Sequence, residues 1–532
     1  MNHIELFAGC GGLSLGLEAA GFELLMANEL SPMAAETFAF NHLGVDLTTS
    51  KNPKGVFWIS SQFARSELQK RLRENPIEAA GLDKEKFTDL STEVISPKEL
   101  KRSLLVGSII DLNLLLERSK GRFLKLLRSA IGGKGVDLVS GGPPCQSFSL
   151  AGLREHNNHR NSLPLEFAKF VDFIKPKIAL LENVSGILSA FDINGKKFYA
   201  WREVASVFSQ IGYVPICIHI NAKRLGVPQN RPRYIMLAVR EDVCKQFLKN
   251  SNDKYLLSIV DESYEAFTKA SEENKGNNEG FVCFDFEKDT VRNKYNGGVL
   301  RELTAFEDQN YVSVKEAIDD LSSKSSKESE YVKEINRLFA KKDSNELNKS
   351  VLNHELRANG PVVMARNRLY QVSHRLEKNI AQNLKKMISM KIEPKLSSHE
   401  YLELSKFWLL DLDGKKQKNL TKKGIERIIQ SVQSKKHSQK ALHPQKPSPA
   451  VLGSPDDTCH YAEKVTTLRT LTVRELARIQ SFPDWFEFRS KVTTGGQYRR
   501  YEVPQYTQVG NAVPPILGAV LGKICTSIIE AK

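Results

Sequence analysis

A cysteine at the end of an expected strand is the clearest candidate for chemistry in this sequence. Val136–Val139 is a short apolar run typical of a buried strand, and Gly-Gly-Pro-Pro-Cys-Gln follows it at 141–146. Ligands of open α/β sheets bind at the carboxyl ends of strands, so a cysteine held there by a stiff loop is a candidate nucleophile. The alternative for Cys145 is a small buried hydrophobic residue, our interpretation of the other six cysteines; Cys10, inside a glycine loop, is a partial exception.

Charged residues flank two further expected strands. Glu182 follows the apolar run Ile178–Leu181 and is a candidate general acid, because partial burial favours a protonated carboxyl group. A capping or salt-bridged glutamate is an equal alternative. Arg231 and Arg233 alternate before the run Tyr234–Val239 and could pair with a carboxylate or a base carbonyl. Their spacing alone favours an exposed surface pair.

A glycine loop lies near the N-terminus, between an apolar run and a helical pattern. Phe-Ala-Gly-Cys-Gly-Gly occupies 7–12, Leu13–Ala20 has helical periodicity, and a strand over Glu23–Ala27 leads to Glu29. Glycines allow close backbone approach, and an acidic residue at the next strand end can accept hydrogen bonds from a ribose. The combination favours a nucleoside cofactor over a tight turn without a ligand.

These segments form an α/β pattern with one interruption. Further strands are expected at 104–110, 136–139, 178–181 and 234–239, and the chain ends in an apolar helix over 516–529. Residues 46–105 are charged and interrupt the pattern, so we interpret them as an insertion.

Composition indicates a large globular protein with localised positive charge. The 532 residues correspond to about three to four average domains, and 41% apolar with 26% charged residues excludes disorder throughout, collagen and a disulfide mini-scaffold. The net charge is +15, of which +11 lies in residues 351–445, with 19 Lys and Arg against 8 Asp and Glu. Solvated helix faces rarely need so much charge, so we expect phosphate contact there.

The remaining composition predicts a soluble intracellular protein. The seven cysteines include no Cys-x-x-Cys pair, which favours reduced thiols and no metal site. No basic segment followed by an apolar run begins the sequence, and apolar stretches such as Val513–Gly522 are shorter than the roughly 18 residues of a membrane span.

Taken together, the motifs resemble those of the DNA cytosine C5-methyltransferase family, of the bacterial restriction–modification type. The resemblance covers about 1–45, 104–240 and 443–525. Its motifs are Phe-Ala-Gly-Cys-Gly-Gly (7–12), Asn-Glu (28–29), Gly-Gly-Pro-Pro-Cys-Gln-Ser-Phe-Ser (141–149), Glu-Asn-Val (182–184), Gln-Asn-Arg-Pro-Arg (229–233), Leu-Thr-Val-Arg-Glu-Leu-Ala-Arg-Ile-Gln-Ser-Phe-Pro-Asp (471–484) and Gln-Val-Gly-Asn-Ala-Val-Pro-Pro (508–515). Seven motifs in the family's order make a specific signal.

The resemblance implies a catalytic role for four residues. Cys145 matches the nucleophile that adds to C6 of cytosine, and Glu182 matches the residue that holds or protonates N3. Arg231 and Arg233 match the pair that orients the base and supports the carboxylate, and nearby cations would favour the thiolate. Because C5 of a paired base is inaccessible, the cytosine must be flipped out of the duplex.

The resemblance also implies S-adenosyl-L-methionine as the methyl donor, with no metal. The residues that match its binding site are Phe7, Ala8, Gly9, Gly11, Gly12, Leu13, Glu29, Ser108, Ile109, Pro144, Leu163, Asn511 and Val513. Three features depart from the family: Glu5 replaces the usual Asp, Ser108 replaces an acidic residue, and Glu29 and Ser108 are far apart in the sequence because of 46–105.

The implied architecture is a Rossmann-like α/β methyltransferase domain, mostly parallel, with a smaller target-recognition domain. We expect the catalytic domain over 1–243, target recognition over 244–470 and a return to the catalytic domain over 471–532. The implied partner is double-stranded DNA, with a cognate restriction endonuclease in the same system, no membrane, and a monomer in the cytoplasm on the nucleoid. Two alternatives stay open: an RNA cytosine C5-methyltransferase, and a non-catalytic DNA-binding protein that kept the fold.

Overall fold

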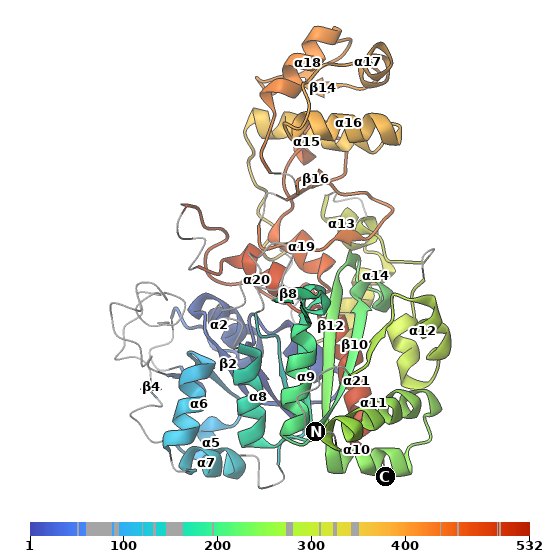
Figure 1. Cartoon of the computed structure of the whole chain (residues 1–532). Helices are drawn as coiled ribbons and strands as arrows, with labels where there is room; N and C mark the ends of the chain where they lie inside the picture. Colours follow the sequence, from blue (N-terminus) through green and yellow to red (C-terminus); the bar gives the residue numbers. More distant parts are fainter. Residues whose placement is uncertain are drawn as a thin grey trace.

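The chain folds into a large lobe built on one sheet and a small helical lobe above it (Figure 1). The structure is a computed structural model. It describes residues 1–49, 53–59, 88–89, 95–119, 121–130, 133, 135–144, 163–193, 196–272, 280–307, 310–322, 327–341, 351–436, 438–454, 457–496, 498 and 502–531. Cys145 and residues 146–162 lie outside the described residues.

The centre of the sheet is parallel and doubly wound, which confirms the expected fold class. Its strands are β1 (Asn2–Leu6), β2 (Glu23–Glu29), β5 (Ser103–Val106), β6 (Leu138–Gly141) and β7 (Ile178–Val184). They lie in the order β5-β2-β1-β6-β7, and all these neighbours are parallel. The order reverses between β1 and β6, and ligands of such sheets bind at the carboxyl ends of strands at this point. The N-terminus lies at the far end of β1 from the small lobe, so those carboxyl ends point toward it (Figure 1).

Further strands extend the sheet to ten at its two edges. Beyond β7 lie β12 (Pro232–Arg240), antiparallel to both neighbours, then β10 (Tyr213–Asn221) and β13 (Cys283–Asp285). Beyond β5 lie β3 (Val56–Trp58) and β4 (Thr88–Asp89).

The segment expected to be an insertion therefore contributes to the sheet. Val56 and Trp58 are buried in one cluster with Leu104 and Val106 of β5. Leu47 is buried in the same cluster. The charge of 46–105 concealed these few apolar residues, whose burial depends on pairing with β5.

Helices cover both faces of the sheet. One face packs against α6 (Ile109–Arg118), α7 (Arg122–Ala130), α8 (Leu163–Ile174) and α9 (Ala200–Gln210), with the short α5 (Pro97–Leu100) nearby. The other packs against α1 (Gly12–Ala19), α10 (Glu241–Asn250), α11 (Lys254–Glu272) and α21 (Pro515–Ile529). Beside β2 lie α2 (Pro32–Phe38) and the π-helical turn η1 (Ala39–Leu43).

The large lobe extends beyond the boundary expected at residue 243. Phe247, Ile259, Phe284 and Leu303 are buried in the same cluster as the sheet residues Ile216 and Ile235. The segments that carry them include α12 (Asp289–Lys294) and η8 (Gly298–Thr304) besides α10, α11 and β13. This core continues about sixty residues past position 243, because the polar surface of 246–304 hides an apolar face that covers the sheet.

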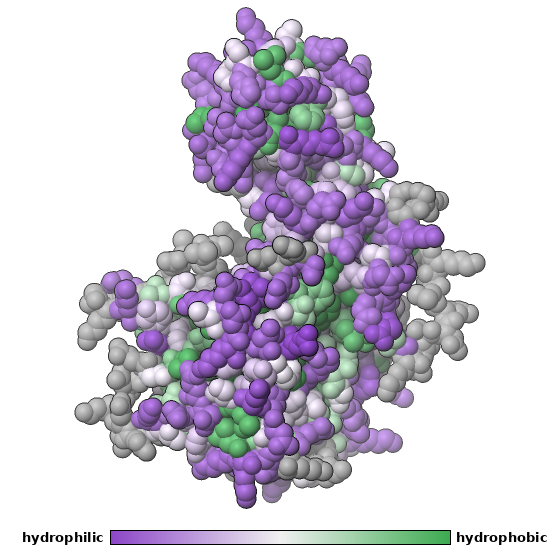
Figure 2. Space-filling model, turned by 90° about the vertical axis from the view of Figure 1, so that its right-hand side faces the viewer, coloured by the Kyte–Doolittle hydropathy of each residue, from purple (hydrophilic) through white to green (hydrophobic). Residues whose placement is uncertain are grey.

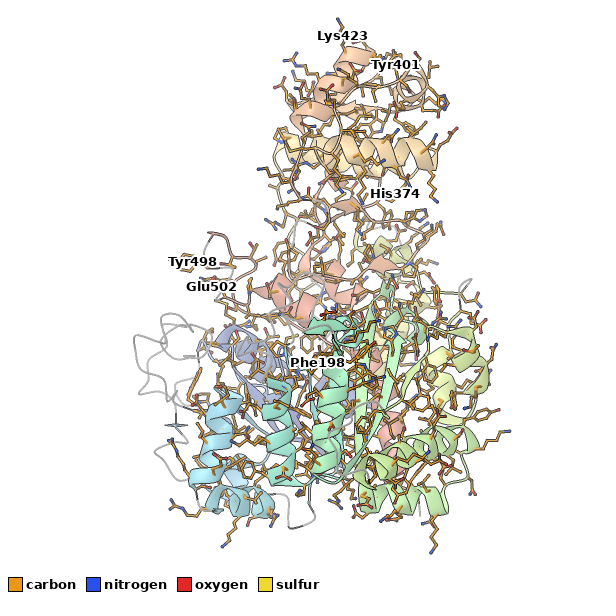
Figure 3. All side chains as sticks on the ribbon, viewed as in Figure 1. Phe198, His374, Tyr401, Lys423, Tyr498 and Glu502 are labelled. Carbon is orange, nitrogen blue, oxygen red and sulfur yellow. The ribbon has the colours of Figure 1, made fainter. Side chains whose placement is uncertain are left out.

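The small lobe, residues 361–441, has a hydrophobic core of its own. Leu369, Leu384, Ile388, Ile425 and Ile429 are buried there. It contains α15 (Pro361–Ser373), α16 (Lys378–Ile388), α17 (Ser398–Ser405), α18 (Lys422–Ser431), β14 (Leu409–Leu410), β15 (Lys416–Gln417) and β16 (Lys440–Ala441), which pairs with β18 (Thr458–Cys459). Figure 2 shows its surface as mostly hydrophilic, and Figure 3 places Lys423 near its tip and His374 near its base.

A third cluster, here called the joint, lies between the lobes. Its helices are α13 (Val314–Ser322), α14 (Glu330–Leu338), α19 (Val473–Ile479) and α20 (Gln505–Asn511). Its buried side chains include Val314, Ile335, Leu476 and Val509, together with Cys10 from the glycine loop. The joint thus packs against the glycine loop, at the carboxyl ends of the strands, through apolar residues.

The C-terminal helix is a core element. The stretch Gln505–Ile529 is long and apolar enough to cross a membrane, longer than the sequence expectation, but 72% of its apolar window is buried inside the protein. It packs on α1 through glycine: a Cβ on Gly16 would lie 2.3 Å from the Pro515 carbonyl oxygen and 2.6 Å from the Ala519 nitrogen. The two backbones therefore touch, and the C-terminus is fixed against the first helix.

Replacing Gly16 by Ala is expected to destabilise the protein despite a better helix former. Alanine gains about 1 kcal/mol of helix propensity, but its methyl group would collide with backbone that cannot rotate away. We expect a net loss of about 2 kcal/mol, measured by urea denaturation. Gly280→Ala is the control, since nothing lies within 4 Å of that Cβ; equal stability of the two variants would contradict the close helix contact.

Candidate active site

The glycine loop after β1 has the backbone shape expected of a ligand-binding turn. Phe7, Gly9 and Gly11 have φ angles of 54°, 56° and 93°, in the left-handed region. The Ala8 amide donates to the Asn28 carbonyl over 3.0 Å, which ties the loop to β2. A Cβ on Gly9 would meet no atom of the described residues within 4 Å, so among these residues the loop borders open space there, and half-buried Phe7 packs at its edge.

Glu29 connects the loop to the next strand end. Its carboxylate accepts hydrogen bonds from the amides of Gly9 and Ser31, both at 2.7 Å. These bonds fix the carboxylate beside the glycine loop. A carboxylate has about four lone-pair sites, so the group can accept hydrogen bonds from ligand hydroxyls as well.

Ser108 lies beside Glu29 although 79 positions separate them in the sequence. Strands β2 and β5 are neighbours with Glu29 opposite Val106, and the Asn28 amide donates to the carbonyls of Leu105 and Gly107. The Ser108 hydroxyl caps α6 by accepting from the Ile110 amide over 3.2 Å, and Ile109 is buried in the core. The pairing of β2 with β5 therefore brings Glu29 and Ser108 close together in space, although they are far apart in the sequence.

The return segment closes on the glycine loop. A Cβ on Gly12 would lie 2.3 Å from the Val513 carbonyl oxygen. Leu13 and Val513 are buried together, whereas Asn511 is exposed at the end of α20. Residues 500 positions apart thus border one site.

The described part of the cysteine loop is fixed next to Glu182. The Asn183 amide donates to the Pro143 carbonyl over 3.1 Å. A Cβ on Gly142 would lie 3.0 Å from a Glu182 carboxylate oxygen, a tight contact that would press on this carboxylate. Pro144 is exposed, and Leu163, where the described chain resumes, packs at the core edge. The sequence predicts no separate role for Asn183. Its contact with the Pro143 carbonyl joins residues 40 positions apart, and such a contact has no signal in the sequence spacing.

Glu182 and Arg233 form a mostly buried ion pair. The Arg233 Nε atom lies 2.6 Å from a Glu182 oxygen, across the antiparallel pair β7 and β12. Burial lowers the pKa of Arg233, and the charge of Glu182 opposes that shift. Glu182 is therefore salt-bridged, which was one of the two interpretations of this residue. The interpretation of Arg231 and Arg233 as an exposed surface pair is wrong, because neither residue is exposed.

Arg231 is buried and donates its hydrogen bonds into the joint. Only 2% of the residue is exposed. Its guanidinium donates to the carbonyls of Val451, Gly510 and Ala512, at 3.1, 2.9 and 3.0 Å. The two arginines therefore act on different partners: Arg233 on a carboxylate and Arg231 on the return segment.

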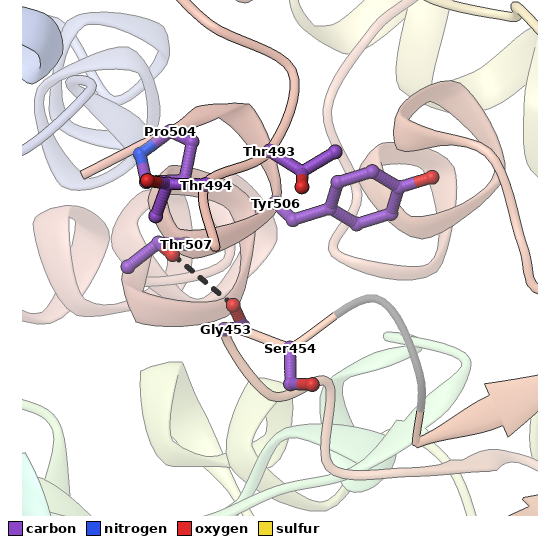
Figure 4. A pocket seen from close by; sticks show the side chains of 7 residues that line it. All are labelled: Gly453, Ser454, Thr493, Thr494, Pro504, Tyr506 and Thr507. Atoms are coloured by element: carbon purple, nitrogen blue, oxygen red, sulfur yellow. Dashed lines mark hydrogen bonds between the residues drawn. The ribbon is translucent and has the colours of Figure 1, made fainter. Parts of the chain in front are cut away.

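A polar hollow lies beside the return motif (Figure 4). This cavity of about 180 Å³ is lined by Gly453, Ser454, Thr493, Thr494, Pro504, Tyr506 and Thr507. The Thr507 hydroxyl donates to the Gly453 carbonyl over 3.1 Å. Among the described residues, no group of three His, Cys, Asp or Glu side chains is arranged to hold a metal ion.

The sequence was compared with known proteins and families. It is 26% identical to the Type II methyltransferase M.DdeI of Desulfomicrobium norvegicum over 529 residues, covering 98% of this chain and 88% of that protein. It is 24% identical to the Type II methyltransferase M1.HphI of Haemophilus parahaemolyticus, covering 98% and 86%. A crystal structure of a putative DNA modification methyltransferase from an E. coli prophage overlaps 99% of both chains at 18% identity and a TM-score of 0.44.

One family matches most of the chain. It is described as C-5 cytosine-specific DNA methylase, and it matches residues 1–54 and 125–527. All seven motifs lie within these two ranges. The chain therefore belongs to the C-5 cytosine-specific DNA methylase family and is a DNA cytosine-5 methyltransferase.

Proposed function

We propose that this enzyme transfers the methyl group of S-adenosyl-L-methionine to C5 of a flipped-out cytosine in a specific duplex DNA sequence. The main observation in support is that two loops begin side by side, from the neighbouring strands β1 and β6, at the point where the strand order of the sheet reverses. The glycine loop leaves β1, the Gly-Gly-Pro-Pro-Cys loop leaves the adjacent β6, and the Glu182–Arg233 pair lies beside the second loop.

The residues around the glycine loop fit the proposed methyl donor. Glu29 offers a fixed carboxylate for ribose hydroxyls, Phe7 an aromatic edge for adenine, and Gly9 open space for the methionine portion. The other proposed contacts are Ala8, Gly11, Gly12, Leu13, Ser108, Ile109, Pro144, Leu163, Asn511 and Val513. When bound, S-adenosyl-L-methionine supplies an electrophilic methyl group.

The protein's task is to make C5 nucleophilic. We assign Cys145 to attack C6 as a thiolate, which moves the electron pair of the C5–C6 double bond onto the ring. Glu182, oriented by Arg233, supplies a proton to N3, which neutralises the negative charge that the thiolate brings into the ring, and takes that proton back when the ring is restored. After C5 is methylated, a base removes the C5 proton and the sulfur–C6 bond breaks, which restores both the double bond and the thiolate. Arg231 acts on this cycle by holding the return segment.

Duplex DNA is proposed to bind between the lobes, with the small lobe as the region of sequence recognition. The lobe carries exposed lysines such as Lys415, Lys416, Lys422 and Lys423, and lysines supply phosphate contacts. The hydroxyl groups of the cavity in Figure 4 suit a further backbone phosphate. Target recognition is accordingly proposed for 361–470, a shorter range than the expected 244–470.

The biological setting is inferred from the relatives. Both full-length relatives are named Type II methyltransferases. We propose that this enzyme likewise protects host DNA in a restriction–modification system with a cognate endonuclease, working as a monomer in the cytoplasm on the nucleoid. Its C-terminal helix is a buried core element, so no membrane partner is proposed.

The substrate is tested by methyl transfer from labelled S-adenosylmethionine to duplex DNA or to tRNA. We expect label in DNA only, and label confined to tRNA would favour the RNA methyltransferase. Cys145→Ala should lower the rate by on the order of 10³-fold or more, because the thiolate makes C5 reactive. Cys283→Ala is the control thiol on β13. A Cys145→Ala protein at the normal rate would refute the mechanism.

Substitutions at Glu182 and Arg231 are expected to separate catalysis from stability. Glu182→Gln preserves shape and should lower kcat by about 10²–10⁴-fold. It also removes the charge paired with Arg233, so some stability should be lost, but less than in Arg231→Met, because the amide oxygen can still accept a hydrogen bond from Arg233. Arg231→Met should instead cost about 3 kcal/mol of folding free energy by leaving three carbonyls without donors. An unchanged kcat in Glu182→Gln would remove Glu182 from the mechanism.

Neutralising the four lysines Lys415, Lys416, Lys422 and Lys423 to Gln should weaken DNA binding. The slope of log affinity against log salt is expected to fall by about 0.9 for each phosphate group that the lysines no longer neutralise, while affinity for S-adenosylmethionine stays the same. The control replaces Lys245, Lys269 and Lys294, which pair with glutamates on the large lobe. Equal effects of the two sets would contradict a phosphate-binding small lobe.

A further inference from the structure

A buried histidine contacts the glycine loop at Gly11. His42 lies on the π-helical turn η1, and only 2% of its side chain is exposed. Its ring stacks on Phe38, with centroids 4.4 Å apart, and meets the edge of Phe486 at 6.1 Å. The ring is therefore fixed in position by two aromatic neighbours, one of them from the joint.

Both ring nitrogens face atoms that accept hydrogen bonds. Nε2 lies 3.1 Å from the carbonyl oxygen of Gly11, and Nδ1 lies 3.0 Å from a carboxylate oxygen of Glu18 on α1. A neutral imidazole has one donor and one acceptor, whereas the imidazolium has two donors. Only the charged ring can make both bonds.

Titratable groups near the His42 ring are Glu18, His3, Glu5 and Arg102. Burial would raise the pKa of Glu18, but the hydrogen bond and the charge of His42 outweigh it, so the pKa is lowered and the carboxylate is ionised. On β1, burial lowers the pKa of His3 to about 4, which leaves that ring neutral at pH 7. Burial also raises the pKa of Glu5 to about 8, and its carboxyl group bonds Ser14 rather than His42. Arg102 donates to the His42 backbone carbonyl.

The contact also explains why position 11 must be glycine. A Cβ there would lie 2.2 Å from His42 Nε2 and 2.9 Å from the Phe38 ring, in addition to the φ of 93°. The ring thus occupies the place of a side chain at residue 11. The same ring is hydrogen-bonded to the Gly11 carbonyl through Nε2.

We propose that His42, as an imidazolium paired with Glu18, is a positioning residue that holds the Gly11 carbonyl and so keeps the loop in the shape that binds S-adenosylmethionine. This inference rests on the proposed function. His42 acts through Gly11, so its loss should affect cofactor affinity more than the chemical step. The signal was hidden in the sequence, because Gly11 and Glu18 lie 31 and 24 positions away from His42.

The test uses His42→Phe in the full-length protein, because phenylalanine keeps the stacked ring and removes both donors. Calorimetry with S-adenosylmethionine should show a Kd raised about tenfold, the size of one charge-assisted hydrogen bond. The fall in kcat at saturating cofactor should be less than about threefold, because the chemical step does not involve His42. His219→Phe is the matched control, since His219 forms a comparable pair with Asp285 at 2.7 Å on β10 and β13.

A second measurement reads the charge of the ring directly. Nitrogen NMR of histidine-labelled wild-type protein at about pH 7.5, assigned by the signals that disappear in His42→Phe, should show a proton on both ring nitrogens. If His42→Phe does not fold, Glu18→Gln replaces it, and we expect its Kd to rise several-fold.

The outcomes separate this inference from the proposed function. Wild-type protein that fails to bind S-adenosylmethionine would overturn the proposed function. Wild-type binding with an unchanged Kd in the variant, or a neutral tautomer in the spectrum, would overturn only the role of His42.

Discussion

The site depends on one buried guanidinium. Arg231 directly precedes the antiparallel strand β12. Its guanidinium donates to three backbone carbonyls in two segments that lie more than 200 residues further along the chain. Two of those carbonyls, Gly510 and Ala512, terminate α20, where helical partners run out. A planar fork with several donors can satisfy such a group of carbonyls at once, which lysine cannot. Docking of the return segment follows from this geometry.

Neighbouring amides extend the same connection toward the glycine loop. Gln229 donates to Gln480 on the joint, and Gln480 donates to the Val509 carbonyl over 2.6 Å. Further along, the backbone carbonyl of Val513 packs against Gly12, and that of Pro515 packs against Gly16 on α1. Each of these polar groups is buried, so each needs its partner to offset the hydration that it gives up on folding. The motifs at 229–233, 471–484 and 508–515 are therefore one structural unit, even though the sequence presents them as separate signals.

The sequence contained the fold class and the strand ends but not the tertiary partners. Periodicity located β1, β2, β6 and β7, and their parallel order follows from α/β alternation. Contacts between distant segments left no local pattern: the burial of Arg231, the pairing of Trp58 in β3 with β5, and the apolar face of 246–304 all arise from long-range packing. The polar composition of 46–105 and of 246–304 led to wrong expectations for these two segments. An element with one buried face needs only a few apolar residues, so its overall composition can be polar.

The separation of cores explains how recognition and chemistry can coexist in one chain. The small lobe is stabilised by its own buried cluster, so its surface can carry a concentration of positive charge without placing that charge beside the Glu182–Arg233 pair. Shortly before α19, Arg469 pairs with the fully buried Glu475 through two hydrogen bonds of 2.8 and 2.7 Å. Under the proposed function, substitutions on the lobe surface change DNA recognition without moving the Glu182–Arg233 pair.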